Sequence, residues 1–225
     1  MADMKLSGVI FDMDGVLCDS EPFICRAAVQ FFHEYHQLTV QAEDFEPFVG
    51  TGENRYLGGV AEKYGRTLDL PSDKRRLYEI YLRIIRGRLQ PIKGALDFVA
   101  ACRRRGLRLA VATSADRIKM DGNLAEIGLP PEQFDACITG DDVRRKKPHP
   151  DIFLKAAETL GLSAGECLVV EDAPSGIQAG KAAGARCLGL TSSFNAATLN
   201  KAGADWTAPD LDHAPADLLA LCGGQ

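Results

Sequence analysis

Short apolar runs that stop at polar residues recur along the chain and predict buried strands. Val9-Ile10-Phe11 ends at Asp12, and comparable runs occupy residues 107–112, 167–170 and 186–190. Runs of this length are typical of strands covered on both faces. Amphipathic helices are expected between them, over residues 94–105, 116–127, 151–160 and 174–183. Alternating strands and helices predict an α/β fold with a doubly wound parallel sheet.

One long segment interrupts this alternation. A crossover between parallel strands needs about a dozen residues, yet the next helix and strand begin only near Pro91. Within the segment, apolar residues recur at helical spacing: Phe23, Ala27 and Phe31, then Leu77, Ile80, Tyr81, Ile84 and Ile85. We therefore predict a small α-helical cap domain, residues 20–90, inserted into a core made of residues 1–19 and 91–225. The joints are expected at residues 18–20 and 90–94.

Composition narrows the class of protein. The 225 residues are 46% hydrophobic and 25% charged, which is typical of a globular domain with a full core. The net charge of −5 disfavours a general electrostatic grip on nucleic acid or anionic lipid, so any anionic substrate must be held by local groups. The seven cysteines are scattered, and no apolar run has the length of a membrane span. We expect a cytoplasmic protein with reduced thiols, and a monomer.

The first candidate site residues follow the first predicted strand. Ligands bind beyond the carboxyl ends of the strands in open parallel sheets, where Asp12 and Asp14 stand two positions apart. Two such carboxylates repel each other unless a cation or a shared proton separates them, and Mg²⁺ suits oxygen ligands. The alternative for Asp-x-Asp-Gly alone is a solvated turn.

Three further polar groups stand where a strand ends or a helix begins. Thr113 and Ser114 follow the second predicted strand and offer hydroxyl and backbone N–H groups to phosphate, or a plain helix cap. Lys147 precedes a predicted helix and is either a phosphate ligand or a surface lysine in a basic run. Glu171 and Asp172 close the strand at 167–170, as further metal ligands or as a helix cap.

In this order the four motifs resemble those of the haloacid dehalogenase-like (HAD) superfamily. The matching stretches are Phe-Asp-Met-Asp-Gly, Ala-Thr-Ser, Lys-Lys-Pro and Val-Glu-Asp. Asp-Ala-Pro-Ser-Gly-Ile-Gln-Ala-Gly and Lys-Pro-His-Pro-Asp-Ile-Phe are similar to the branch of β-phosphoglucomutase and phosphoglycolate phosphatase, whose helical cap follows the first motif. The resemblance spans nearly the whole chain and implies a Rossmann-like core.

The resemblance also implies roles for the motif residues. Asp12 would be the nucleophile that forms an aspartyl phosphate, and Asp14 the general acid and base. Thr113, Ser114 and Lys147 would bind the phosphoryl oxygens. Mg²⁺ would be held by the Asp12 carboxylate, the Asp14 carbonyl and Asp172, with Glu171 in support through water.

Two functions of the branch remain open, together with a non-enzymatic one. A sugar-phosphate mutase holds a second phosphate with a histidine, a lysine and an arginine of its cap, and these positions align with Ile24, Val49 and Glu53. The resemblance therefore favours a Mg²⁺-dependent phosphatase acting on a small phosphorylated metabolite, such as a sugar phosphate. The mutase is the first alternative, and an interaction module without catalysis is the second.

The cap loop that begins at Gly50 supplies the residues expected to select the substrate. Its glycines suggest a turn close to the site, followed by Glu53, Asn54 and Arg55. The Glu53 carboxylate repels a second phosphate but accepts hydrogen bonds from hydroxyl groups, whereas Arg55 can serve a distal phosphate. The alternative for Glu53 is a solvated glutamate at a helix N-terminus.

Overall fold

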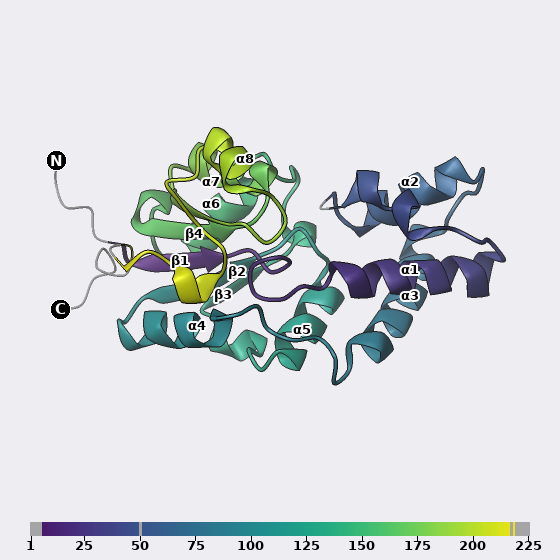
Figure 1. Cartoon of the computed structure of the whole chain (residues 1–225), viewed down its shortest axis with the longest axis horizontal. Helices are drawn as coiled ribbons and strands as arrows, with labels where there is room; N and C mark the ends of the chain where they lie inside the picture. The colour runs from purple at the N-terminus through teal and green to yellow at the C-terminus, as the bar shows by residue number, and fades with distance from the viewer. Residues whose placement is uncertain (1–5, 50, 217, 219–225) are drawn as a thin grey trace.

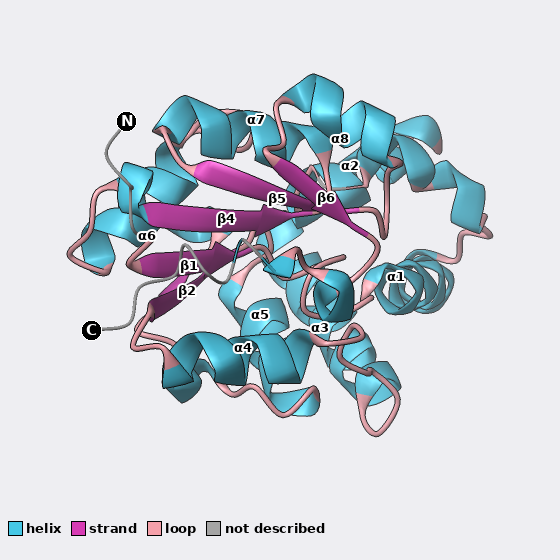
Figure 2. Ribbon diagram, turned by 60° about the vertical axis from the view of Figure 1, so that its left-hand side comes forward, coloured by secondary structure: helices cyan, strands magenta, loops and turns pink. Residues whose placement is uncertain are grey.

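A parallel six-stranded sheet forms the centre of the larger part of the molecule (Figures 1 and 2). The computed structural model describes residues 6–49, 51–216 and 218. Within them the strand order is β3-β2-β1-β4-β5-β6, and all neighbouring strands are parallel. The strands are β1 (Gly8–Phe11), β2 (Arg108–Ala112), β3 (Ala136–Ile138), β4 (Cys167–Glu171), β5 (Arg186–Leu190) and β6 (Trp206–Ala208).

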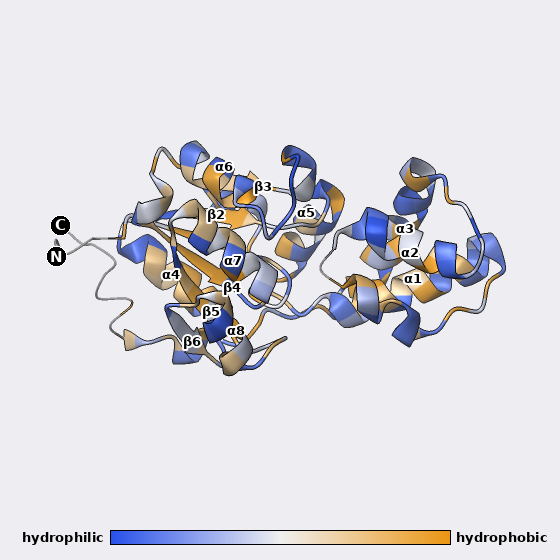
Figure 3. Ribbon diagram, turned by 90° about the horizontal axis from the view of Figure 1, so that it is seen from above, coloured by the Kyte–Doolittle hydropathy of each residue, from blue (hydrophilic) through white to orange (hydrophobic). Residues whose placement is uncertain are grey.

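Helices cover both faces of this sheet, as the apolar runs predict. One face carries α4 (Ala95–Arg104) and α5 (Arg117–Glu126), and the other carries α6 (Asp151–Thr159), α7 (Pro174–Ala183) and α8 (Ala196–Ala202) (Figure 2). Successive residues of β1 serve opposite faces, since Val9 and Phe11 pack in one apolar cluster and Ile10 in the other. Figure 3 shows the apolar colour along the strands of this sheet. The predicted doubly wound α/β fold is confirmed.

The prediction missed the edge strands β3 and β6 and the helix α8. β3 and β6 have three residues each, and α8 has seven. A three-residue strand at an edge is too short to leave a recognisable apolar run. Short 3-10 turns lie at Ala42–Asp44, Glu46–Phe48, Pro131–Gln133, Gly140–Asp142, Ala164–Glu166 and Leu211–His213.

A second body of helices stands beside the carboxyl ends of the strands (Figure 1). It consists of α1 (Glu21–His36), α2 (Glu53–Lys63) and α3 (Leu70–Ile85), packed around aromatic side chains such as Phe31, Phe32 and Phe45. These helices lie inside the predicted cap segment, and we call them the cap. The exact bounds of 20–90 stay a prediction.

The two connections between cap and core run side by side. Cys18 and Pro91 form an antiparallel bridge, and the Ile92 N–H donates to the Leu17 carbonyl at 2.9 Å. No helix in the described part of the chain is both long and apolar enough to cross a bilayer.

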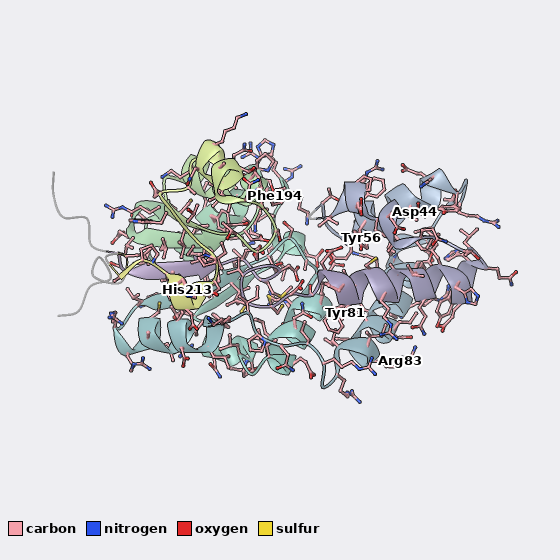
Figure 4. The ribbon with its side chains drawn as sticks, in the orientation of Figure 1. Asp44, Tyr56, Tyr81, Arg83, Phe194 and His213 are labelled. Carbon is pink, nitrogen blue, oxygen red and sulfur yellow. The ribbon has the colours of Figure 1, made fainter. Side chains whose placement is uncertain are left out.

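Helix α5 is the part of the core on which the cap rests. Its residues Asp116 (the N-cap), Lys119 and Asn123 recur at i, i+3 and i+7, the spacing of one helix face. Each contacts a different cap residue: Lys74 pairs with Asp116, Glu53 with Lys119, and the Tyr81 hydroxyl donates to Asn123 Oδ1 at 2.6 Å. Figure 4 shows Tyr81 at this junction. The cap is therefore docked through polar contacts as well as through its backbone joints.

Candidate active site

Strand register brings the predicted motifs together. Phe11 of β1 lies opposite Val111 of β2 on one side and Val170 of β4 on the other. The next residue, Asp12, donates its N–H to the Val170 carbonyl at 2.9 Å. The ends of three adjacent strands thus converge on Asp12, as expected for the crevice of a parallel sheet.

A cavity of about 660 Å³ lies at this point, between core and cap. Tyr56 of the cap and Phe194 of the core face it from opposite sides (Figure 4). Every core residue predicted for the site lines this cavity: Asp12, Asp14, Thr113, Ser114, Lys147, Glu171 and Asp172. A cavity of this size fits a small ligand.

Lys147 is a buried cation that lines the cavity. Its Nζ lies 2.5 Å from Asp12 Oδ1 and 2.6 Å from Glu171 Oε1, and it donates to the Ala112 carbonyl at 3.2 Å. Burial lowers its pKa, but the two carboxylates raise it more strongly, and the net pKa is above the usual value. Only 7% of its side chain is exposed, which excludes the surface lysine considered for this position.

Asp12 is a buried carboxylate in a crowded electrostatic setting. Burial raises its pKa, Lys147 lowers it, and the nearby Glu171 and Asp14 raise it again, with a net value of about 7. Asp172 behaves similarly, because burial and then Glu171 and Asp12 raise its pKa. The site thus holds more negative charge than Lys147 alone compensates.

A glycine makes room for these carboxylates. Gly15 has φ +75°, and a Cβ on it would lie 1.9 Å from Asp172 Oδ2. The Ser193 hydroxyl donates to the same oxygen, and the Ser192 hydroxyl donates to the Gly15 carbonyl at 2.6 Å. Sequence reasoning missed both serines, although they follow the strand β5 and the rule of strand ends applies to them as well.

The N-cap positions considered as alternatives for Thr113 and Glu171 are occupied by other residues. Asp116 is the N-cap of α5 and Ala173 that of α7, so Thr113 and Glu171 are free of that function. The Thr113 side chain is buried, and its Oγ1 accepts the Ala115 N–H at 3.1 Å. Its hydroxyl can still donate toward a ligand.

The structure brings only part of the predicted cap set to the cavity. Ile24, Val49 and Glu53, the positions aligned with the mutase's phosphate-binding residues, all line it. Asn54 and Arg55 are exposed and do not line it. Arg55 instead pairs with Glu62 at 2.9 Å and lies over the Phe48 ring. Gly50 lies outside the described residues.

Glu53 is buried, which rules out the solvated glutamate considered for it. Only 6% of its side chain is exposed, and burial raises its pKa although Lys119 lowers it. Its Oε1 lies 3.6 Å from Lys119 Nζ, while Oε2 has no hydrogen-bond partner within the part of the chain that the structure describes. Lys119 and Lys146 line the cavity as well and were not predicted.

Residues 6–184 match the sequence profile of the haloacid dehalogenase-like hydrolases. The chain belongs to this hydrolase family. The resemblance inferred from the four motifs is therefore confirmed, and so is the prediction of an enzyme.

Two curated relatives match most of this chain. The chain is 46% identical over 210 residues to SUPPRESSOR OF QUENCHING 1, chloroplastic, from Arabidopsis thaliana; the match covers 92% of this chain but 20% of that protein. It is 31% identical to hexitol phosphatase A of Escherichia coli, with 88% and 89% of the two chains covered. Among solved structures, CbbY from Rhodobacter sphaeroides in complex with phosphate superposes with a TM-score of 0.80 at 26% identity, covering 92% and 95% of the chains.

Proposed function

We propose that this HAD-like hydrolase is a phosphatase that hydrolyses a small phosphorylated metabolite, such as a sugar phosphate. The observation that carries the proposal is the buried Asp12 beside Lys147 in a cavity between core and cap. The names of its relatives, hexitol phosphatase A among them, support the substrate class. A cavity covered by a cap fits a small ligand better than a macromolecule.

The reaction would proceed in two steps on Asp12. In the first, an Asp12 carboxylate oxygen attacks phosphorus, the bond from phosphorus to the leaving oxygen breaks, and Asp14 gives that oxygen a proton. In the second, Asp14 takes a proton from water, the water oxygen attacks phosphorus, and the bond to Asp12 breaks. Lys147 and the Thr113 hydroxyl would bind the phosphoryl oxygens throughout.

The residues at the strand ends fit Mg²⁺. Among residues 6–49, 51–216 and 218, no group of three or more His, Cys, Asp and Glu side chains is arranged to hold a metal. Mg²⁺ needs fewer, because it is usually bound through one or two carboxylates with waters and phosphate oxygens. Asp12 and Asp172, with the Asp14 carbonyl, supply that set, Glu171 supports it, and Gly15 leaves the space open. Mg²⁺ would offset the charge of the carboxylates and the phosphate.

Mg²⁺ binding should depend on pH near neutrality. Asp12 must lose its proton to bind the metal, and its pKa without metal is raised to about 7. Its ionised fraction falls roughly tenfold from pH 8 to pH 6. The dissociation constant for Mg²⁺ should therefore rise by at least roughly tenfold, because Asp172, whose pKa is also raised, must lose its proton too. Calorimetric titration of the protein with MgCl₂ at several pH values measures this. Equal affinity at pH 6 and pH 8 would contradict the assignment of Asp12 as a ligand.

The cap wall favours a phosphatase over a mutase. At the three aligned positions, the cavity is lined by two apolar side chains, Ile24 and Val49, and by the acidic Glu53. We expect β-glucose 1-phosphate, with a catalytic amount of the 1,6-bisphosphate, to yield inorganic phosphate. A malachite-green assay and a coupled glucose 6-phosphate assay distinguish the outcomes. Rapid bisphosphate-dependent formation of glucose 6-phosphate would assign the mutase activity instead.

A screen tests the function as a whole. About a hundred phosphorylated metabolites and p-nitrophenyl phosphate are assayed with Mg²⁺, and one or a few sugar phosphates should stand out by kcat/KM. Failure to hydrolyse any of them would favour the interaction module. The cytoplasmic location and the monomeric state stay predictions, which fractionation and light scattering can test.

A further inference from the structure

Lys119 is a buried cation that no motif predicted. It lies on α5, lines the cavity, and only 5% of its side chain is exposed. Its Nζ lies 3.0 Å from Asp14 Oδ2 and 3.6 Å from Glu53 Oε1. Lys119 is thus in contact with a core carboxylate and a cap carboxylate at once.

The charge on Lys119 is maintained by these two partners. Burial lowers its pKa, but Asp14 and Glu53 raise it more strongly, and the net pKa is well above the usual value. A buried ammonium group is costly unless it is paired, so each partner constrains where Nζ lies.

Asp14 is held from two sides. Lys119 binds Oδ2, and the Ser20 hydroxyl donates to Oδ1. Ser20 precedes the first cap helix, whereas Lys119 belongs to the core. The orientation of the Asp14 carboxylate therefore depends on both parts of the molecule.

Glu53 reaches Lys119 because of the local backbone of the cap loop. Gly52 has φ +85°, a conformation that favours glycine, and a Cβ built on it would lie 3.7 Å from the Ser114 carbonyl. The cap backbone thus passes close to the core just before Glu53, the first residue of α2.

We propose that Lys119 is a positioning residue that orients Asp14 toward the leaving oxygen, and that Glu53 holds Lys119 in place from the cap. The docked cap is then linked through one lysine to the group that protonates the leaving oxygen. This inference rests on the proposed function and assigns positioning roles in it to Lys119 and Glu53.

Leaving-group dependence tests the positioning role. A series of aryl and alkyl phosphates is assayed with wild type and Lys119→Met, and log kcat/KM is plotted against leaving-group basicity. We expect kcat/KM for alkyl phosphates to fall by about 100-fold, because they need the proton most, and that for p-nitrophenyl phosphate to change by less than about threefold. The plot should therefore steepen in the variant. An equal loss across the series would show a structural role and overturn the proposal.

A double-mutant cycle tests the link to Glu53. Glu53→Gln should reproduce the steeper plot in weaker form, and Lys119→Met/Glu53→Gln should lose no more than Lys119→Met alone, since both act on Asp14 by one path. Losses that multiply would mean that Glu53 acts on the substrate independently, which would overturn its part in the proposal.

Another contact between α5 and the cap provides a matched control. Lys74→Met breaks an ion pair to Asp116 whose Nζ–Oδ2 distance is 2.5 Å. Neither Lys74 nor Asp116 lines the cavity. This variant should leave the slope of the plot unchanged, and a steeper plot would overturn the proposal, because it would show that any loosening of the cap has this effect. A wild type without phosphatase activity would refute the proposed function together with this inference, whereas an active wild type with an unchanged slope in Lys119→Met would refute the inference alone.

Discussion

Asp12→Asn should abolish phosphatase activity and leave the fold intact. The substitution keeps the side-chain volume but removes the nucleophile, so we expect the rate to fall by about four orders of magnitude or more. Steady-state assays with p-nitrophenyl phosphate and the best substrate of the screen measure the loss. Acid quenching of the wild type during turnover, followed by peptide mass spectrometry, should locate a phosphoryl group on Asp12.

The control for this variant is Asp97→Asn. Asp97 is an exposed aspartate in the first turn of α4, outside the cavity, and its substitution should leave activity near that of wild type. Circular dichroism and thermal unfolding verify that both variants fold. If Asp12→Asn retains a tenth of the wild-type rate, Asp12 does not form the covalent intermediate.

Removal of divalent metal should have the second largest effect. Lys147 and Lys119 do not compensate the several carboxylates of the site together with the phosphate, and a bound metal is worth several kcal/mol at the transition state. We expect EDTA to lower the rate at least about 100-fold and MgCl₂ to restore it. Excess CaCl₂ should inhibit, because Ca²⁺ favours larger and more flexible coordination than the compact site needs.

The metal experiment has a clear contrary outcome. Full activity in EDTA, after dialysis against chelator, would exclude a metal from the reaction and leave Lys147 as the main counter-charge. A variant that lacks one proposed ligand, Asp172→Asn, should need more MgCl₂ for half-maximal activity. If its requirement equals that of wild type, Asp172 is not a ligand.

The core of the site was predictable because a parallel sheet gathers the ends of its strands at one edge. Asp12, Thr113 and Asp172 each follow an apolar run that can be read from the sequence, and the register of β1 with β2 and β4 brings them together. Buried strands and their ends leave a local pattern that is independent of partners far along the chain.

Lys119 could not be found in this way, because its significance depends on partners remote in sequence. It is 105 positions from Asp14, and a lysine in an amphipathic helix normally points to solvent. The one available signal was the polar spacing of Asp116, Lys119 and Asn123 on α5, which predicts a polar contact face without naming what it contacts. The edge strands were missed for a different reason: β3 and β6 have three residues each and are too short to leave a recognisable apolar run.

The paired joints between core and cap have an evolutionary consequence. The chain leaves the core at Leu17 and returns at Ile92, and these two residues are hydrogen-bonded to each other. An insertion, deletion or exchange between them therefore leaves the order and register of the sheet unchanged. Selection can then alter which molecules bind in the cavity without disturbing the carboxylates that the core contributes to it. Enzymes built in this way can diversify in substrate while inheriting the same chemistry.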